Sequence, residues 1–150
     1  MEVVLFEGDL VEFLDLFQES TGLTDETAIK KLIAIEVARG TSYGVIRVDG
    51  LIVGMVGLYV DDVPGVRELE PAQIIDFAVR EEFRGRGFGK ILMDWAVERA
   101  RSFGCDALWL YTGGGESIGK IYRSLGFVEA GRNEGFWEGK WDRVWFRRSL

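Results

Sequence analysis

The chain has 150 residues, of which 47% are hydrophobic and 29% are charged, and its net charge is −7 at pH 7 with no histidine. This length predicts one domain, residues 1–150, with its own core. The missing histidine excludes Ser-His and Cys-His catalysis and histidine metal sites. A lone cysteine, Cys105, excludes an internal disulfide and predicts a reducing, cytoplasmic location.

Composition also excludes two classes of partner. The longest apolar run, Leu51 to Val60, is far shorter than the ~20 residues that a membrane-spanning helix needs. The acidic balance of the chain disfavours nucleic acid, because binding to phosphates requires a basic surface. We therefore expect neither a membrane nor a nucleic acid as the main partner.

The first forty residues predict a strand and two helices. Residues 1–6 predict a short strand, and apolar residues at helical spacing over 10–17 predict the first helix. Thr24 is placed to cap a second helix whose first turn is acidic. That helix is expected to end near Gly40.

A hairpin, a loop and a third long strand follow. Strands over 42–48 and 51–60 flank Asp49-Gly50, which is a strong signal for a two-residue hairpin turn. Proline and glycine predict a loop over 61–72. An apolar strand over 73–79 comes next, and a glycine-rich turn directly follows it.

The remaining elements alternate helix and strand. A helix runs to about residue 103, and its inward face is formed by Phe88, Ile91, Leu92, Trp95 and Ala96. A buried strand over 107–111 and a helix over about 116–125 follow. Two final strands, near 127–130 and 143–147, flank a Trp-rich loop. The order β-α-α-β-β-β-α-β-α-β-β predicts one mixed α/β domain.

The glycine-rich turn, residues 84–90, is the most informative segment of the chain. It reads Arg-Gly-Arg-Gly-Phe-Gly-Lys between a strand and a helix. Glycines let the backbone curl so that several N–H groups converge, and the helix N-terminus adds positive potential. Such a turn binds a phosphate or pyrophosphate. The alternative is a glycine-rich loop with solvated arginines.

The spacing of the turn selects among phosphate sites. The dinucleotide pattern G-x-G-x-x-G fails because Leu92 fills the last glycine position counted from Gly87. The triphosphate pattern fails because Arg84 and Ile91 replace its first glycine and its hydroxyl residue. The pattern Arg84-x-x-Gly87-x-Gly89 fits, and it resembles the coenzyme A signature of the GCN5-related N-acetyltransferases (GNAT family).

A second segment carries the same resemblance. Residues 122–127 are similar to the family motif Tyr-x-x-x-Gly-Phe, and the element order matches over essentially the whole chain. The asparagine that often begins the preceding helix in the family is Gly115 here. The resemblance implies that Tyr122 protonates the departing thiolate. The alternative is a core aromatic, since Tyr122 shares a helix face with Ile118 and Leu125.

The resemblance implies a mostly antiparallel sheet flanked by helices, with acetyl-coenzyme A as co-substrate and no metal. Strand 73–79 would splay from strand 107–111, and the pantetheine arm would lie in the gap along Phe77, Ala78 and Val79. The pyrophosphate would be held by Arg84, Gly85, Arg86, Gly87, Phe88, Gly89 and Lys90. An amine would attack the thioester directly, with a backbone N–H near Val79 stabilising the oxyanion.

Asp76 is the candidate general base of this reaction. It lies where many relatives carry an acidic residue on the cleft side, and it can accept the amine's proton directly or through water. Even alternation along the strand would place Asp76 with Ile74 and Ala78, opposite Phe77 and Val79. The alternative is a solvated carboxylate, or one paired with a nearby arginine.

Two other functions stay open. A non-catalytic coenzyme A-binding regulatory module is favoured by Gly115 in place of the family asparagine. A nucleotide hydrolase would use Gly114 to Lys120, which fits G-x-x-x-x-G-K, although Ile121 replaces the hydroxyl that binds magnesium.

The amine acceptor is expected to be cationic. Residues 1–72 carry 5 basic and 14 acidic side chains, and the resemblance implies that their first two helices wall the acceptor site. An acidic wall attracts cations, although the charge can also be a solvated surface. The chain also has three tryptophans spaced by four residues, Trp137, Trp141 and Trp145. We expect them to pack in the core or the sheet. The alternatives are that they form a wall of the acceptor pocket or a homodimer contact.

Overall fold

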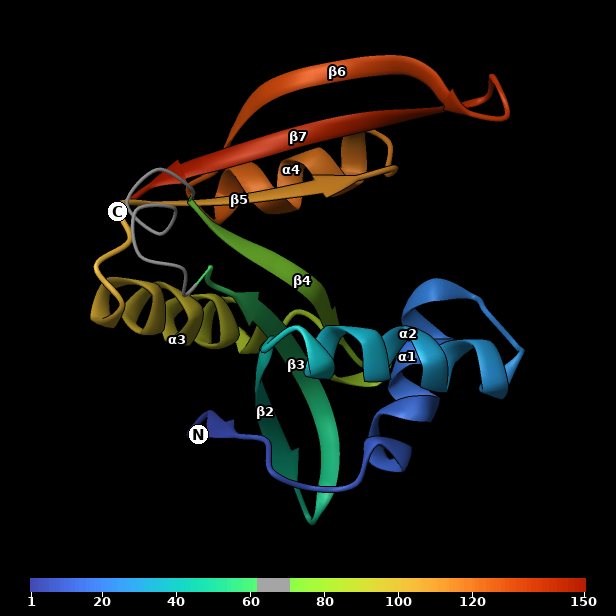
Figure 1. Ribbon diagram of the computed structural model, residues 1–150, viewed down its shortest axis with the longest axis vertical. Coiled ribbons are helices and arrows are strands. Elements are labelled where there is room, and N and C mark those ends of the chain that lie inside the picture. Colours follow the sequence, from blue (N-terminus) through green and yellow to red (C-terminus); the bar gives the residue numbers. More distant parts are fainter. Residues whose placement is uncertain (62–70) are drawn as a thin grey trace.

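The computed structural model describes residues 1–61 and 71–150, and its centre is one seven-stranded sheet in the order β1-β2-β3-β4-β5-β7-β6 (Figure 1). The strands are β1 (Val4–Leu5), β2 (Ser42–Val48), β3 (Leu51–Tyr59), β4 (Ala72–Val79), β5 (Ala107–Thr112), β6 (Val128–Trp137) and β7 (Trp141–Ser149). All neighbours are antiparallel except β4 and β5. The predicted mixed, mostly antiparallel α/β fold is confirmed. The predicted loop over 61–72 falls almost entirely outside the described residues.

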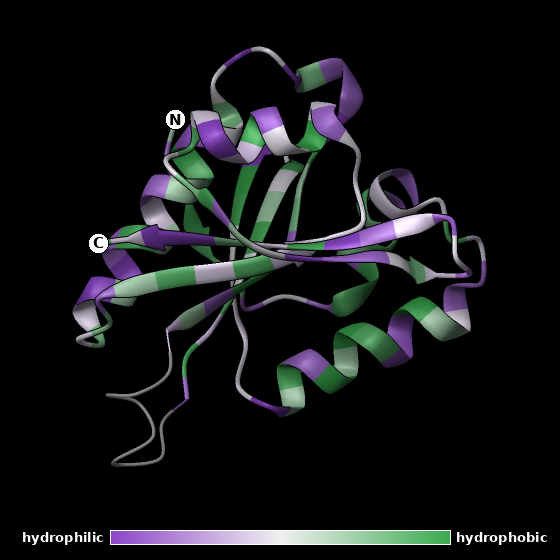
Figure 2. Ribbon diagram, turned by 90° about the horizontal axis from the view of Figure 1, so that it is seen from above, coloured by the Kyte–Doolittle hydropathy of each residue, from purple (hydrophilic) through white to green (hydrophobic). Residues whose placement is uncertain are grey.

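Helices lie on both faces of the sheet (Figure 2). They are the 3-10 helices η1 (Leu10–Phe13) and η2 (Glu81–Phe83), and the α-helices α1 (Leu14–Thr21), α2 (Glu26–Ala38), α3 (Phe88–Ser102) and α4 (Glu116–Ser124). Hydrophobic and hydrophilic residues are mixed along the α-helices in this view, and the α-helices each bury part of their surface. No helix of the described ranges is long and apolar enough to cross a membrane.

The two faces of the sheet bury different cores. On one face, α3 packs Leu92, Met93 and Ala96 against strands from both halves of the sheet. On the other face, α1 and α2 pack Phe17 and Ile29 against β2, β3 and β4 alone. The second core therefore stops at β4, and no described helix of that core covers β5, β7 and β6 on this face.

Two details of the N-terminal half differ from prediction. The cap of α2 is Asp25, whose carboxylate accepts hydrogen bonds from the N–H groups of Thr27 and Ala28, and the prediction of Thr24 is wrong. A carboxylate is the stronger cap here, because it is charged and the N–H groups carry the positive end of the helix dipole. The first strand is only two residues long, and its pairing with β2 ends at Leu5.

The C-terminal hairpin is longer than predicted, and the expected Trp-rich loop is wrong. Strands β6 and β7 extend until Trp137 pairs with Trp141, so these tryptophans belong to the sheet. Aromatic residues favour strands. Gly135 and Gly139 adopt φ of 61° and 67°, which supplies the tight turn and the irregular pairing before it.

Strand β4 contains a bulge, and the expectation that it alternates evenly is wrong. Met55 pairs with Ala78 and Gly57 with Ile75, so Asp76 and Phe77 together oppose one residue of β3. Asp76 takes φ of 53°, a left-handed conformation that aspartate tolerates better than most residues. The extra residue places Phe77 on the α3 face with Ile74, while Ala78 joins the α1–α2 core.

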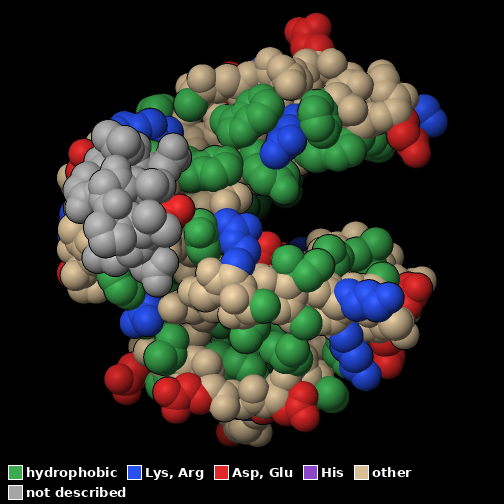
Figure 3. Space-filling view, viewed as in Figure 1, with side chains coloured by type: hydrophobic (Ala, Val, Ile, Leu, Met, Phe, Trp, Pro, Cys, Tyr) green, Lys and Arg blue, Asp and Glu red, His purple; other side chains and the backbone are tan. Residues whose placement is uncertain are grey.

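Strands β4 and β5 separate soon after they meet. They pair only at Ala72 with Leu108 and at Gln73 with Trp109. Beyond these pairs the ribbons diverge, and a hollow opens between the half built on β1 to β4 and the half built on β5 to β7 (Figures 1 and 3). The bulge lies on the edge of this hollow, because Asp76 follows the last paired residue of β4 by three positions.

Candidate active site

The glycine-rich turn has the backbone shape that the sequence predicts for an anion site. Gly85 and Gly87 adopt φ of 72° and 85°, and a Cβ atom at either position would project into open space. Gly87 is the N-cap residue of α3 and makes no side-chain hydrogen bond to the first N–H groups of that helix. These N–H groups and the helix dipole are therefore available to a phosphate oxygen.

The basic side chains of the turn are exposed and anchored on the protein. Arg84 Nε donates to the Val79 carbonyl at 2.9 Å, and Arg86 donates to the Glu82 carbonyl at 2.9 Å. Lys90 forms an ion pair with Asp94 one helical turn later. These contacts hold the cations beside the turn and leave each with further N–H groups for a polyanion.

Arg80 is a buried arginine next to the turn, and the sequence alone did not assign it a role in the site. Arg80 Nε donates to the Ile52 carbonyl at 2.7 Å, and its guanidinium bonds Asp15 at 2.6 Å. Glu19 of α1 also accepts a hydrogen bond from the Glu81 N–H. The arginine thus ties α1 to the end of β4. The only sequence signal was a charged residue directly after an apolar strand.

The end of β4 turns its backbone toward the hollow. The Arg80 N–H donates to the Val53 carbonyl at 2.8 Å. Because antiparallel strands alternate between hydrogen-bonded and non-hydrogen-bonded pairs, the backbone groups of Val79 point away from β3, and so do those of Phe77. Arg84 occupies the Val79 carbonyl, and the Val79 N–H faces the gap where β4 and β5 separate.

Asp76 is a perturbed carboxyl at the bulge. Its pKa is raised to about 6, mainly by burial; a hydrogen bond from Tyr43 opposes the shift, and the charge of the nearby Glu36 adds to it. The Tyr43 hydroxyl donates to Asp76 Oδ2 at 2.8 Å. The same burial and the Asp76 charge raise the pKa of Tyr43, so its hydroxyl keeps its proton. Tyr43 was missed from the sequence, because nothing local links β2 to the bulge.

Tyr122 lies on α4 beside the end of β4. Its ring centroid is 6.2 Å from that of Phe77, and the rings of Phe127 and Phe146 pack at 5.9 Å and 5.6 Å. Burial raises its pKa to about 12, so the hydroxyl is protonated at neutral pH. In the described part of the chain no hydrogen bond to this hydroxyl is formed. The packing is that of a core aromatic, while the polar end remains available.

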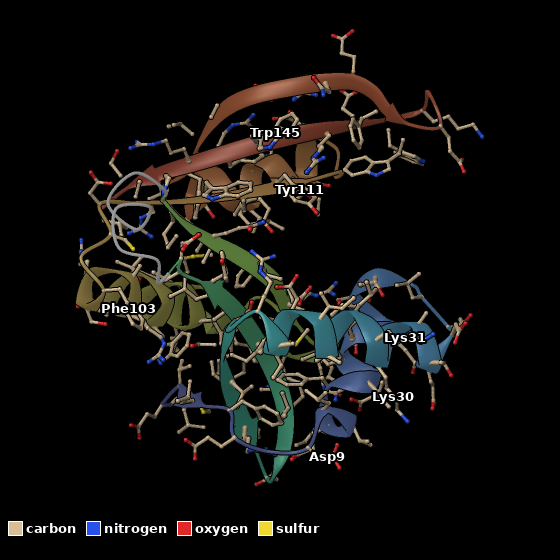
Figure 4. All side chains as sticks on the ribbon, in the orientation of Figure 1. Asp9, Lys30, Lys31, Phe103, Tyr111 and Trp145 are labelled. Atoms are coloured by element: carbon tan, nitrogen blue, oxygen red, sulfur yellow. The ribbon has the colours of Figure 1, made fainter. Side chains whose placement is uncertain are left out.

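The other wall of the hollow is aromatic. Trp109 and Tyr111 of β5 and Trp145 of β7 lie on the sheet face that α1 and α2 leave uncovered. Figure 4 labels Tyr111 and Trp145 on the half that lies across the hollow from Lys30 and Lys31 of α2. Hydrophobic side chains line this wall in the space-filling view (Figure 3).

The segment from Gly114 to Lys120 does not build a phosphate loop. It forms the start of α4 and one wall of a pocket of about 210 Å³ between α4 and the β6–β7 hairpin. The arginines of this pocket are already paired, Arg123 with Glu116 and Arg132 with Asp142. Across the described residues, no group of three acidic or cysteine side chains could hold a metal ion.

Comparison with known proteins agrees with this geometry. Residues 9–127 match the model of the acetyltransferase (GNAT) family. An uncharacterized N-acetyltransferase in the pepI 3′ region of Lactobacillus delbrueckii subsp. lactis is 29% identical over 72% of each chain. The chain therefore belongs to the GNAT acetyltransferase family, whose members transfer an acetyl group from acetyl-coenzyme A.

Solved structures share the fold. A Bacillus subtilis acetyltransferase in complex with coenzyme A is 22% identical, with a TM-score of 0.75 over 99% of this chain and 98% of that one. The ribosomal-protein-S18-alanine N-acetyltransferase of Escherichia coli is 19% identical, with a TM-score of 0.79 over 99% and 92%. As a member of the family that residues 9–127 match, the protein is an acyltransferase with acetyl-coenzyme A as donor.

Proposed function

We propose that this protein acetylates a primary amine by direct attack on the thioester, with Asp76 as general base and Tyr122 as general acid. The observation that supports this is the bulge, which leaves Asp76 beside Tyr43 on the α1–α2 side of β4 and Phe77 on the α3 side. Asp76 precedes Phe77, and the ring of Phe77 packs against the ring of Tyr122. A carboxylate and a phenol thus flank the place where β4 and β5 separate.

The residues of the chain fit the donor. Acetyl-coenzyme A supplies an electrophilic acyl carbon and a thiolate leaving group. Residues 84–90 would hold its pyrophosphate on the free N–H groups before α3, where side chains at Gly85 and Gly87 are absent. The backbone of Phe77, Ala78 and Val79 would run beside its pantetheine arm, as an edge strand runs beside a new partner.

Each proton in the reaction has a residue to hold it. Asp76 accepts the proton that the attacking nitrogen loses as the C–N bond forms. The Val79 N–H donates a hydrogen bond to the carbonyl oxygen as negative charge develops there. When the C–S bond breaks, Tyr122 gives its hydroxyl proton to sulfur, and a proton from water restores the phenol. A buried phenol suits this role because it keeps its proton until the thiolate needs it.

The test is amine-dependent release of coenzyme A. A panel of amines is mixed with acetyl-coenzyme A, and free thiol is followed through the first turnover and the steady state. We expect continuous release with at least one amine and an acetylated product in mass spectrometry. Tight binding of coenzyme A with neither a burst nor steady release for any amine would favour the non-catalytic regulatory module.

We also propose that the attacking group is a cationic amine in solution. Asp76 and Glu36 lie on the α2 side of the hollow, where Glu36 is fixed by Arg39 and Thr41. The apparent KM for cationic amines should rise with ionic strength, because salt screens the attraction. Equal use of neutral amines with no salt dependence would contradict this.

Three further expectations stay predictions: a single domain over 1–150, a cytoplasmic location and a homodimer contact.

A further inference from the structure

Arg143 of β7 is held by three aromatic rings and has no polar partner among the described residues. Its guanidinium carbon lies 3.9 Å from the ring centroid of Tyr111, 4.9 Å from that of Phe136 and 5.0 Å from that of Trp145. Among residues 1–61 and 71–150, neither a carboxylate nor a hydrogen-bond acceptor pairs with it, and its buried Nε lacks any partner. Buried polar groups of proteins are normally satisfied.

The arginine faces the hollow of the active site. Its neighbour Val144 is buried in the core shared with α3, so Arg143 projects from the opposite face of β7. That face also carries Trp145 and its strand partner Tyr111, and the α1–α2 core does not reach it. In Figure 3 a basic side chain lies among the hydrophobic ones over β5 and β7.

Asp76 and Arg143 both follow the point where β4 and β5 separate. Gln73 of β4 pairs with Trp109 of β5, and Asp76 and Thr112 each lie three residues further along these parallel strands. Thr112 pairs with Val144, the residue next to Arg143. Asp76 and Arg143 therefore lie on the same side of the sheet, one on each of the two halves that the separation of β4 and β5 opens.

The surroundings of Arg143 favour a carboxylate as its ligand. Aromatic rings hold the guanidinium by cation–π contact and stacking, which fixes its orientation without using its N–H groups. A planar guanidinium with free N–H groups binds a carboxylate through two parallel hydrogen bonds. The low-dielectric, aromatic surroundings strengthen such a charge-assisted bond.

We propose that the acceptor carries a carboxylate as well as its amine, and that Arg143 binds the carboxylate while the amine lies at Asp76. This inference rests on the proposed function and narrows it. The acceptor is then an amino acid-like molecule or a peptide with a free carboxylate, and its apolar body lies against Tyr111 and Trp145. Polyamines, which lack the anionic end, become poor substrates.

The experiment compares amines that differ only in the carboxylate. One arm uses ω-amino carboxylates of increasing chain length beside the matching alkylamines, and tyrosine beside tyramine. A second arm uses short peptides with a free or an amidated C-terminus, which separates a small-molecule acceptor from a peptide. Each pair is assayed with the wild-type protein, with Arg143→Met, which keeps an unbranched chain against the rings, and with the control Arg147→Met.

The control is matched in strand and face. Arg147 projects from the same face of β7 as Arg143, but it is exposed and donates to Ser149. We expect Arg143→Met to lower kcat/KM for a carboxylate-bearing acceptor about 10- to 100-fold, the loss typical of a hydrogen bond to a charged group. The matching amine without carboxylate should change little, and Arg147→Met should behave as wild type.

Binding is measured separately so that this inference and the proposed function can fail independently. Calorimetry follows the same compounds on the wild-type and Arg143→Met proteins saturated with coenzyme A. Tighter binding of the carboxylated member, lost in Arg143→Met, supports the inference even if no compound is acetylated. Equal binding and turnover of both members of every pair, or an equal loss for both in Arg143→Met, would overturn it.

Discussion

The Tyr43 hydroxyl donates a hydrogen bond of 2.8 Å to Asp76 Oδ2, which joins β2 to the bulge of β4 across 33 residues of sequence. The bond stabilises the ionised carboxylate, while burial of the same group favours the neutral acid. The two effects leave a carboxyl with a pKa of about 6, between that of a solvated aspartate and neutral pH. This is the range in which a general base is both ionised and basic.

The Tyr43–Asp76 hydrogen bond predicts that the low-pH limb of the kcat/KM profile shifts when the bond is removed. A base acts only when ionised, so kcat/KM should rise with pH through a pKa of about 6. Tyr43→Phe keeps the buried ring against Phe13 and removes the hydroxyl, so the pKa of Asp76 rises and the limb moves to higher pH. Rates measured across the pH range check this. An unmoved limb would exclude Asp76 as the titrating base.

Asp76→Asn should stabilise the protein while it lowers activity. The pKa of Asp76 is raised from 3.8 to about 6 on folding, so its contribution is most favourable below pH 3.8 and is lost as pH rises through 6. Because a tenfold change in proton affinity corresponds to about 1.4 kcal/mol, the contribution is at most about 3 kcal/mol. Urea unfolding at pH 8 should show the variant to be more stable, with the difference shrinking near pH 4. A less stable variant at pH 8 would show that the carboxylate stabilises this site.

Tyr122→Phe tests the hydroxyl alone. The ring contacts with Phe77, Phe127 and Phe146 do not need the oxygen, so the melting temperature should hardly change. Turnover should fall about 10²- to 10⁴-fold, the usual contribution of a general acid, while the affinity for coenzyme A stays the same. Tyr59→Phe, which removes the hydroxyl from a ring that stacks against Arg39, is the control. Unchanged turnover with a lower melting temperature would mean that Tyr122 is a packing residue.

Gly87→Ala tests the pyrophosphate site. A side chain at Gly87 is strained by φ of 85° and would project into the space where the phosphate oxygens are expected. The affinity for acetyl-coenzyme A should fall about 10- to 100-fold in calorimetry, as when a charge-assisted hydrogen bond is lost. Gly104→Ala has a similar strain, φ of 82°, at the other end of α3 and should lower stability without changing this affinity. Equal affinity losses in both variants would assign the effect to strain.

Local features of the fold could be predicted from the sequence. The turn at residues 84–90 needs only glycines at left-handed positions between a strand and a helix, and the hairpin at Asp49-Gly50 needs only its two residues. The inward face of α3 follows from helical spacing, and Leu92 and Ala96 are fully buried as expected. In each case the residues that decide the structure are neighbours in the chain, so their interactions can be derived from the sequence alone.

The site itself depended on contacts between distant segments. The bulge at Asp76 arises from the register between β3 and β4, and this register reverses the face that each later residue occupies. Tyr43 reaches Asp76 from another strand, and the rings around Arg143 come from β5, β6 and β7. The sequence determined the turn that is expected to bind the donor, because the turn is local. Only the tertiary structure decided which groups face the acceptor, because strand register and burial depend on how the whole sheet packs.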